Sequence, residues 1–278
     1  MLTTIELIKK DGGVLTLPIY DPTNFAVIDV QGLDPVKANI VTSNFSQMDG
    51  GQFQASRREM RNIVFKIRIL SNPGDLSVQD LRKQLYGYLL PKSDIKMRFI
   101  QDGITSVLIQ GQVESFDAPI FVKEPEATIS VLCFDPDFYS ETEFTLTGSS
   151  VSTTSTSNNP LVYNGDIDSG FLFTITATAA VASFTLQNTL DDGSVKTMTF
   201  SDSLGTLVSG DIIKVSTVPG NKYVTRTRSG VETSILWALN RSSDWIKLYP
   251  GTNRIRVRTA TNTGQAYSIK YTNKIGGL

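Results

Sequence analysis

The stretch NIVFKIRIL at residues 62–70 decides the fold of the N-terminal half of the chain. Every second residue in it is large and apolar, namely Ile63, Phe65, Ile67 and Ile69. Side chains of a strand point alternately to its two faces, so this period of two predicts a strand with one buried face. A sheet with a core on one side therefore organises this half.

A helix is predicted after this strand. Ser77 and Asp80 resemble the two ends of a capping box, a common helix start. Apolar residues then recur at helical spacing as Leu81, Leu85 and Leu89. Pro91 cannot continue a helix, so the pattern predicts a helix over about residues 78–90.

Three more strands are predicted in this half, at residues 95–101, 106–116 and 127–134. Gly111 lies inside the second of them and indicates a bulge or a close approach of packed groups. Cys133 lies on the apolar face of the third strand and is interpreted as a small buried side chain.

The C-terminal half contains many short strands separated by turn residues. They are predicted at residues 171–178, 182–187, 195–200, 212–216, 223–228, 254–259 and 266–271. Such a series is typical of a β-sandwich of jelly-roll type. The segment at 148–160 is rich in Ser and Thr, so we expect a linker there, part of which can run as a polar strand.

The sequence therefore predicts a mainly β protein with two β-sandwich-like domains. The first spans residues 1–147 and carries the single helix and a long hairpin, and the second spans residues 161–278. The chain has 278 residues, which exceeds the usual size of one domain.

The composition excludes several classes of chemistry. The chain has no His and one Cys, so it cannot form a Ser-His-Asp triad, an imidazole base, a His metal site or an internal disulfide. We expect no enzyme, no cofactor and no metal. The net charge of -1 gives no overall attraction to nucleic acid, and the uncharged run at 169–190 is too polar to cross a membrane.

Residues 38–60 are mostly polar and turn at Asp49, Gly50 and Gly51, which predicts a long exposed hairpin. A two-stranded ribbon is marginally stable alone, so a neighbouring molecule is expected to hold it. The expected apolar anchors are Phe45, Met48 and Phe53, and the alternative is that they pack on their own domain. The cations at its base, expected to meet a neighbour's carboxylates, are Arg57, Arg58 and Arg61.

A row of cations on one strand, Arg254, Arg256 and Arg258, is the candidate for nucleic-acid binding. The row lacks interleaved aromatic residues, so a solvated or subunit-facing surface is the favoured interpretation. Trp245, with Tyr249 nearby, is the candidate sugar platform, against the favoured alternative of a packed structural Trp.

Two carboxylates, Asp135 and Asp137, could serve as an acid/base pair of a hydrolase. Neither belongs to a complete calcium-loop pattern. Aspartates are common in turns because their side chains bond to the nearby backbone, so turn formation is the favoured interpretation.

Two stretches resemble the distal tail proteins of long-tailed, siphovirus-type bacteriophages. One is GQFQASRREMRNIVFKI at residues 51–67, which is followed by the predicted helix. The other is the C-terminal run from SGDIIKVS at 209–216 to SSDWIKLYPGTNRI at 242–255. Together they cover both predicted domains.

The resemblance implies a hexameric ring at the tail tip of the virion, made in the host cytoplasm. Its N-terminal domains and hairpins would form the inner belt, with galectin-like C-terminal domains outside. The implied partners are the tail tube protein and the tail-associated, baseplate and receptor-binding proteins, with DNA passing through the channel. A carbohydrate-binding tail or adhesion module is the alternative function.

Overall fold

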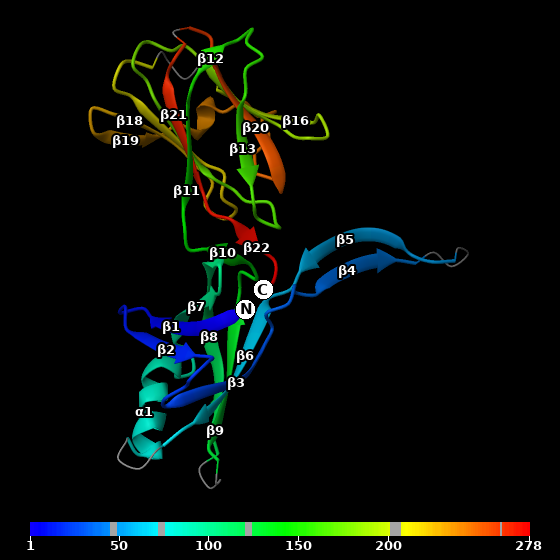
Figure 1. Ribbon diagram of the computed structural model, residues 1–278. Coiled ribbons are helices and arrows are strands. Elements are labelled where there is room, and N and C mark those ends of the chain that lie inside the picture. The colour runs from blue at the N-terminus through cyan, green and yellow to red at the C-terminus, as the bar shows by residue number, and fades with distance from the viewer. Residues whose placement is uncertain (45–48, 72–75, 120–123, 201–206, 262) are drawn as a thin grey trace. The chain divides into compact units, whose positions relative to one another are not determined.

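The computed structural model describes residues 1–44, 49–71, 76–119, 124–200, 207–261 and 263–278. Among these residues the chain is mainly strand (Figure 1), with the single α-helix α1 (Val78–Leu89), so the prediction of a mainly β protein is confirmed. The chain forms two compact units. The N-terminal unit comprises Met1–Glu141 and Ile275–Leu278, and the C-terminal unit comprises Thr142–Lys274.

The N-terminal unit is built on one sheet with the strand order β2-β1-β7-β8-β9-β6-β3. Its strands are β1 (Leu2–Lys9), β2 (Val14–Pro18), β3 (Phe25–Gln31), β6 (Arg61–Ile69), β7 (Asp94–Gln101), β8 (Ile104–Asp117), β9 (Glu126–Cys133) and β10 (Phe138–Ser140), the last paired with β8. Strand β22 (Lys274–Ile275) lies at the boundary between the units in the sequence. Lys274 is the last residue of the C-terminal unit, and Ile275 belongs to the N-terminal unit.

The sheet curves around a single core. In β6 the residues predicted to face inward are buried, and their neighbours are not. Leu17 of β2 and Phe25 of β3 lie at opposite ends of the strand order, yet both belong to the cluster that contains Phe65. One curved sheet thus supplies both walls of this core, which agrees with the predicted sandwich-like domain.

The predicted helix is α1 (Val78–Leu89). Ser77 caps it, because its Oγ accepts a hydrogen bond from the backbone N–H of Asp80 at 3.2 Å. The leucines at helical spacing are buried in the N-terminal core, as Leu81, Leu85 and Leu89. The apolar stripe therefore covers the core while the polar face meets solvent.

The C-terminal unit is a sandwich of two sheets. One sheet holds β11 (Phe144–Ser149), β21 (Ala266–Tyr271), β14 (Leu172–Thr176), β17 (Ile212–Ser216), β18 (Tyr223–Arg228) and β19 (Val231–Ser234). The other holds β12 (Val151–Ser152), β20 (Gly251–Thr259), β15 (Phe184–Thr189), β16 (Val195–Phe200) and β13 (Asn159–Tyr163). Phe173 of the first sheet stacks on Phe184 of the second, with ring centroids 6.2 Å apart.

The Ser/Thr-rich segment differs from the expected linker. The N-terminal unit ends at Glu141, so residues 148–160 lie inside the C-terminal unit. Within that segment β12 runs parallel to β20, and β13 begins at Asn159. The segment has little apolar surface to bury, and only part of its backbone pairs at a sheet edge, through β12 and the start of β13.

Gly111 marks a close approach, as the sequence indicated. A Cβ atom there would lie 2.8 Å from Cys133 Sγ and 2.8 Å from the Leu132 carbonyl oxygen. We expect Gly111→Ala to lower the free energy of unfolding of the N-terminal unit by about 1–3 kcal/mol, measured by urea denaturation. Gly87→Ala is the control: Gly87 is in α1 with no atom within 4 Å of its added Cβ, so this change should stabilise by roughly 0.5 kcal/mol.

Candidate functional site: the β4–β5 arm

Strands β4 (Ala38–Ser43) and β5 (Gln52–Arg58) pair as a two-stranded antiparallel ribbon, which we call the arm. Figure 1 shows the two strands side by side, apart from the main sheet. Gly50 has φ +90°, a conformation that favours glycine, so the predicted turn is present. Among the described residues, β4 and β5 pair only with each other.

A bulge decides which side chains share a face of the arm. Val41 is opposite Ala55, but the next residue, Thr42, is opposite Phe53, so Gln54 is the extra residue of β5. Without this bulge Phe53 would lie on the face of Ala55. With it, Phe53 joins Thr42 and Ile40 on the other face.

This apolar face is open to solvent. Ile40 is 60% exposed and Phe53 is 63% exposed. The smaller residues Val41 and Ala55 lie on the opposite face and are also exposed. Of the other predicted hairpin residues, Asp49 and Gly51 are exposed at the turn, and Phe45 and Met48 lie outside the described residues.

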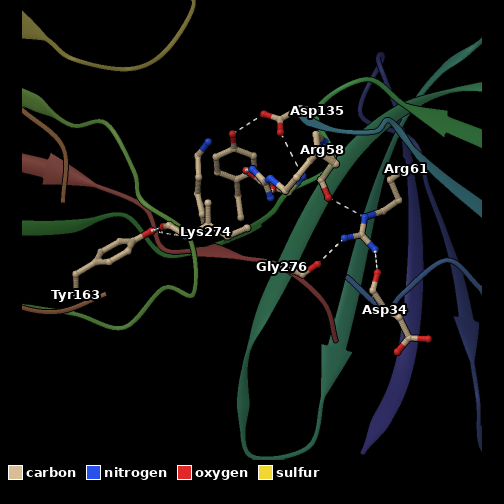
Figure 2. Close-up of polar contacts among 11 residues, drawn as sticks. Asp34, Arg58, Arg61, Asp135, Tyr163, Lys274 and Gly276 are labelled. Atoms are coloured by element: carbon tan, nitrogen blue, oxygen red, sulfur yellow. Dashed lines mark hydrogen bonds and ion pairs between the residues drawn. The ribbon is translucent and has the colours of Figure 1, made fainter. Parts of the chain in front are cut away.

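Arg61 is buried beside the base of the arm and binds backbone carbonyls there. Its side chain is 1% exposed, and Figure 2 shows its guanidinium directed at the carbonyl oxygens of Asp34 and Gly276. It donates to the carbonyls of Pro136 (2.7 Å), Gly32 (2.5 Å), Asp34 (2.7 Å) and Gly276 (2.6 Å). Burial lowers the pKa of Arg61.

The expectation that Arg61 meets a neighbour's carboxylate is therefore wrong. The physical reason is that the fork of an arginine has enough N–H donors to bind several carbonyls of its own chain at once. Those carbonyls come from the segment before β4, from the segment before β10 and from the chain end, so Arg61 connects three distant parts of one unit.

The other two arginines at the base differ from each other. Arg58 forms an ion pair with Asp137, whose side chain is 2% exposed, so Arg58 is already engaged within its own chain. Arg57 is exposed.

Asp135 accepts hydrogen bonds from the Tyr139 hydroxyl at 2.5 Å and from the Asp137 backbone N–H at 3.2 Å. Both candidate hydrolase carboxylates thus have partners inside the N-terminal unit.

The arginine row on β20 is partly covered. Arg254 pairs with Asp191 at 2.8 Å. Arg256 donates to the carbonyls of Thr156 and Ser157, and Arg258 donates to that of Ser155. The Ser/Thr-rich segment therefore lies over the row, which corrects the expectation of an open basic surface. The backbone carbonyls of Ser155, Thr156 and Ser157 need hydrogen-bond donors, and Arg256 and Arg258 provide them.

Trp245 is partly buried and packs against the core of the C-terminal unit, with Lys222 Nζ 5.2 Å from the ring centroid. Tyr249 is half-buried, and its backbone is held by the buried Asn253 side chain. Sequence reasoning missed Trp237, which is 62% exposed on a 3-10 turn at Leu236–Ala238.

Within the described ranges no helix is long and apolar enough to cross a bilayer.

Residues 164–274 match the family model for the siphovirus-type tail component, C-terminal domain. The C-terminal unit is similar to the C-terminal domain of siphovirus-type tail components. The resemblance to distal tail proteins that was inferred from sequence is thereby confirmed. The match covers most of the C-terminal unit, from just after β13 to Lys274.

The fold of the whole chain is similar to that of the Dit protein of phage SPP1, a paradigm of the hub adsorption apparatus in phages that infect Gram-positive bacteria. The two share 17% identity with a TM-score of 0.71, over 97% of this chain and 98% of that chain. A chain of the phage P2 baseplate in its activated conformation with Ca is also similar, with 9% identity, a TM-score of 0.51 and full coverage of both chains. No curated protein matches this chain in sequence.

Proposed function

We propose that this chain is a distal tail protein that forms a hexameric ring at the tail tip. The ring joins the tail tube to the baseplate and to the receptor-binding proteins. The observation that carries the proposal is the arm, an exposed ribbon with large apolar side chains in a chain whose C-terminal unit is similar to that of siphovirus-type tail components. The fold likeness to the SPP1 hub protein supports it.

The arm gives a physical reason for self-association. An isolated two-stranded ribbon is marginally stable in water, and exposed Ile and Phe side chains gain free energy when they are buried. When the arm of each copy binds a different surface on the next copy, the contact is heterologous, and a suitable rotation closes it into a ring. Six copies are what the resemblance to distal tail proteins implies.

In this proposal the protein works by assembly and performs no catalysis. The N-terminal units and arms form the inner belt, and the C-terminal units, as galectin-like domains, present docking surfaces on the outside. DNA only passes through the channel, which agrees with a net charge of -1, since passage needs no attraction to specific bases.

The mass and outline of the purified protein test the proposal. Six copies of 30.5 kDa make a closed particle of about 183 kDa, which sedimentation velocity measures and negative-stain images show as a ring. A species that stays at 30.5 kDa up to the highest soluble concentration contradicts the ring, as does an open filament.

A further inference from the structure

Strand β19 forms an edge of the C-terminal unit. It is the last strand of its sheet and, within the described ranges, it pairs only with β18 (Figure 1). The second sheet of the sandwich ends at β16, whose edge is covered, because Asn240 and Asp244 donate backbone hydrogen bonds to the carbonyls of Thr199 and Thr197. All four residues of β19 are exposed. An exposed strand edge is a template for pairing with another chain.

The register shows which backbone groups of β19 are available. Ile235, directly after the strand, donates its N–H to the carbonyl of the opposite residue, Val224, at 2.9 Å, so the two form a hydrogen-bonded pair. In an antiparallel ladder such pairs alternate with pairs whose N–H and C=O groups point away from each other. The backbone groups of Glu232 and Ser234 therefore point away from β18. Each of these residues offers one N–H and one C=O to a further strand.

Three large apolar side chains beside this edge are exposed. Val231 is 63% exposed, and Leu236 and Trp237, on the 3-10 turn just after the strand, are 48% and 62% exposed. We call β19 together with Leu236 and Trp237 the edge site. Tryptophan is enriched among the residues that contribute most to protein interfaces, so Trp237 suits a contact with an apolar side chain of a partner.

The strands at this edge are positively charged. The chain from Asp211 to Arg241, which includes β17, β18 and β19, has five cations and two carboxylates, although the whole chain has a net charge of -1. The cations are Lys214, Lys222, Arg226, Arg228 and Arg241. Both carboxylates have partners, because Asp211 pairs with Arg228 and Glu232 accepts a hydrogen bond from the Thr225 hydroxyl at 2.7 Å. This charge favours an acidic partner and disfavours the same edge of a second copy.

We propose that the edge site binds an extended acidic segment of a partner protein as an additional strand of the sheet. The segment pairs with the backbone of Glu232 and Ser234, its carboxylates meet the surrounding cations, and one of its apolar side chains packs on Trp237. In this mode the backbone hydrogen bonds give affinity and the side chains give specificity. The inference rests on the proposed function, in which the C-terminal units present docking surfaces, and it locates one of them.

A labelled peptide tests the edge site on the full chain. The probe is a short fluorescein-labelled peptide in which Glu alternates with Val, and its binding is followed by fluorescence anisotropy. One control peptide has Lys in place of every Glu. The other keeps every Glu but carries methyl groups on its backbone nitrogens, so it cannot donate to the carbonyls of β19. We expect the probe to bind about tenfold more tightly than either control, or better.

Variants of the chain locate the bound peptide. Ser234→Pro removes an N–H that faces the added strand and breaks no hydrogen bond to β18, whereas Ser234→Val keeps that N–H and is the matched control. Trp237→Ala removes the apolar contact, and Trp245 fluorescence still reports whether the C-terminal unit is folded. We expect Ser234→Pro and Trp237→Ala each to weaken binding of the probe about tenfold, and Ser234→Val to leave it unchanged.

The outcomes separate the edge site from the ring. Equal binding of the probe and the N-methylated peptide, or binding that Ser234→Pro and Trp237→Ala leave unchanged, overturns strand addition at β19. The peptide comparison decides even where Ser234→Pro does not fold. A native chain that sediments as a ring and does not bind the probe overturns the edge site and leaves the ring intact. A chain that binds the probe as expected and sediments only as a monomer supports the edge site and contradicts the ring.

Discussion

Arg61→Met is expected to unfold the N-terminal unit far more easily than the native chain, lowering its free energy of unfolding by about 3–5 kcal/mol. The substitution keeps a long apolar side chain but leaves four carbonyls without their buried donor. Each unsatisfied buried polar group costs about 1–3 kcal/mol. Arg61→Lys keeps the charge but has only three donors, so its loss should be smaller than that of Arg61→Met.

The two units can be followed separately in this experiment. Both tryptophans, Trp237 and Trp245, belong to the C-terminal unit, so their fluorescence reports that unit, while far-ultraviolet circular dichroism follows both. Arg61→Met should shift a dichroism transition and leave the fluorescence transition in place. The matched control is Arg57→Met, because Arg57 is exposed and its loss should stay within ~0.5 kcal/mol. Equal effects of the two changes would show that Arg61 does not hold the fold together.

Local patterns predicted those elements whose own residues determine them. The period-two run at 62–70 became β6, and the capped leucine repeat became α1, because burial of one face follows directly from each pattern. The strands at 212–216, 223–228 and 266–271 have the predicted bounds. The Asp-Gly-Gly turn likewise specified the arm, since few residues tolerate a positive φ.

The candidate site depended on contacts between distant segments, which no local pattern contains. Arg61 binds a carbonyl 215 residues away, so it had the same sequence signature as its exposed neighbour Arg57. The Ser/Thr-rich segment gave no signal that its carbonyls bind Arg256 and Arg258, which are about a hundred residues further on. The bulge at Gln54 also escaped prediction, although it determines the face on which Phe53 lies.

The second large effect concerns assembly. Ile40→Ser with Phe53→Ser removes both large apolar groups from one face of the arm while leaving the core untouched, since both side chains are more than half exposed. Truncating an apolar anchor at the centre of an interface costs about 2 kcal/mol. Two such losses at each contact weaken it by about 4 kcal/mol, which is roughly a thousandfold in affinity.

The matched control changes the same number of residues on the other face of the same ribbon. Val41→Ser with Ala55→Ser removes exposed apolar groups at neighbouring positions, so it changes strand propensity and solubility similarly. Because Val41 and Ala55 face away from the proposed contact, this variant should still assemble. The fluorescence transition of the C-terminal unit should be the same in both variants.

Sedimentation velocity of the native chain and these two arm variants, at one protein concentration, tests most directly whether the apolar face of the arm holds the copies together. We expect about 183 kDa for the native chain and for Val41→Ser with Ala55→Ser, and 30.5 kDa for Ile40→Ser with Phe53→Ser. If the Ile40→Ser, Phe53→Ser chain sediments as the native particle does, the apolar face of the arm does not hold the copies together.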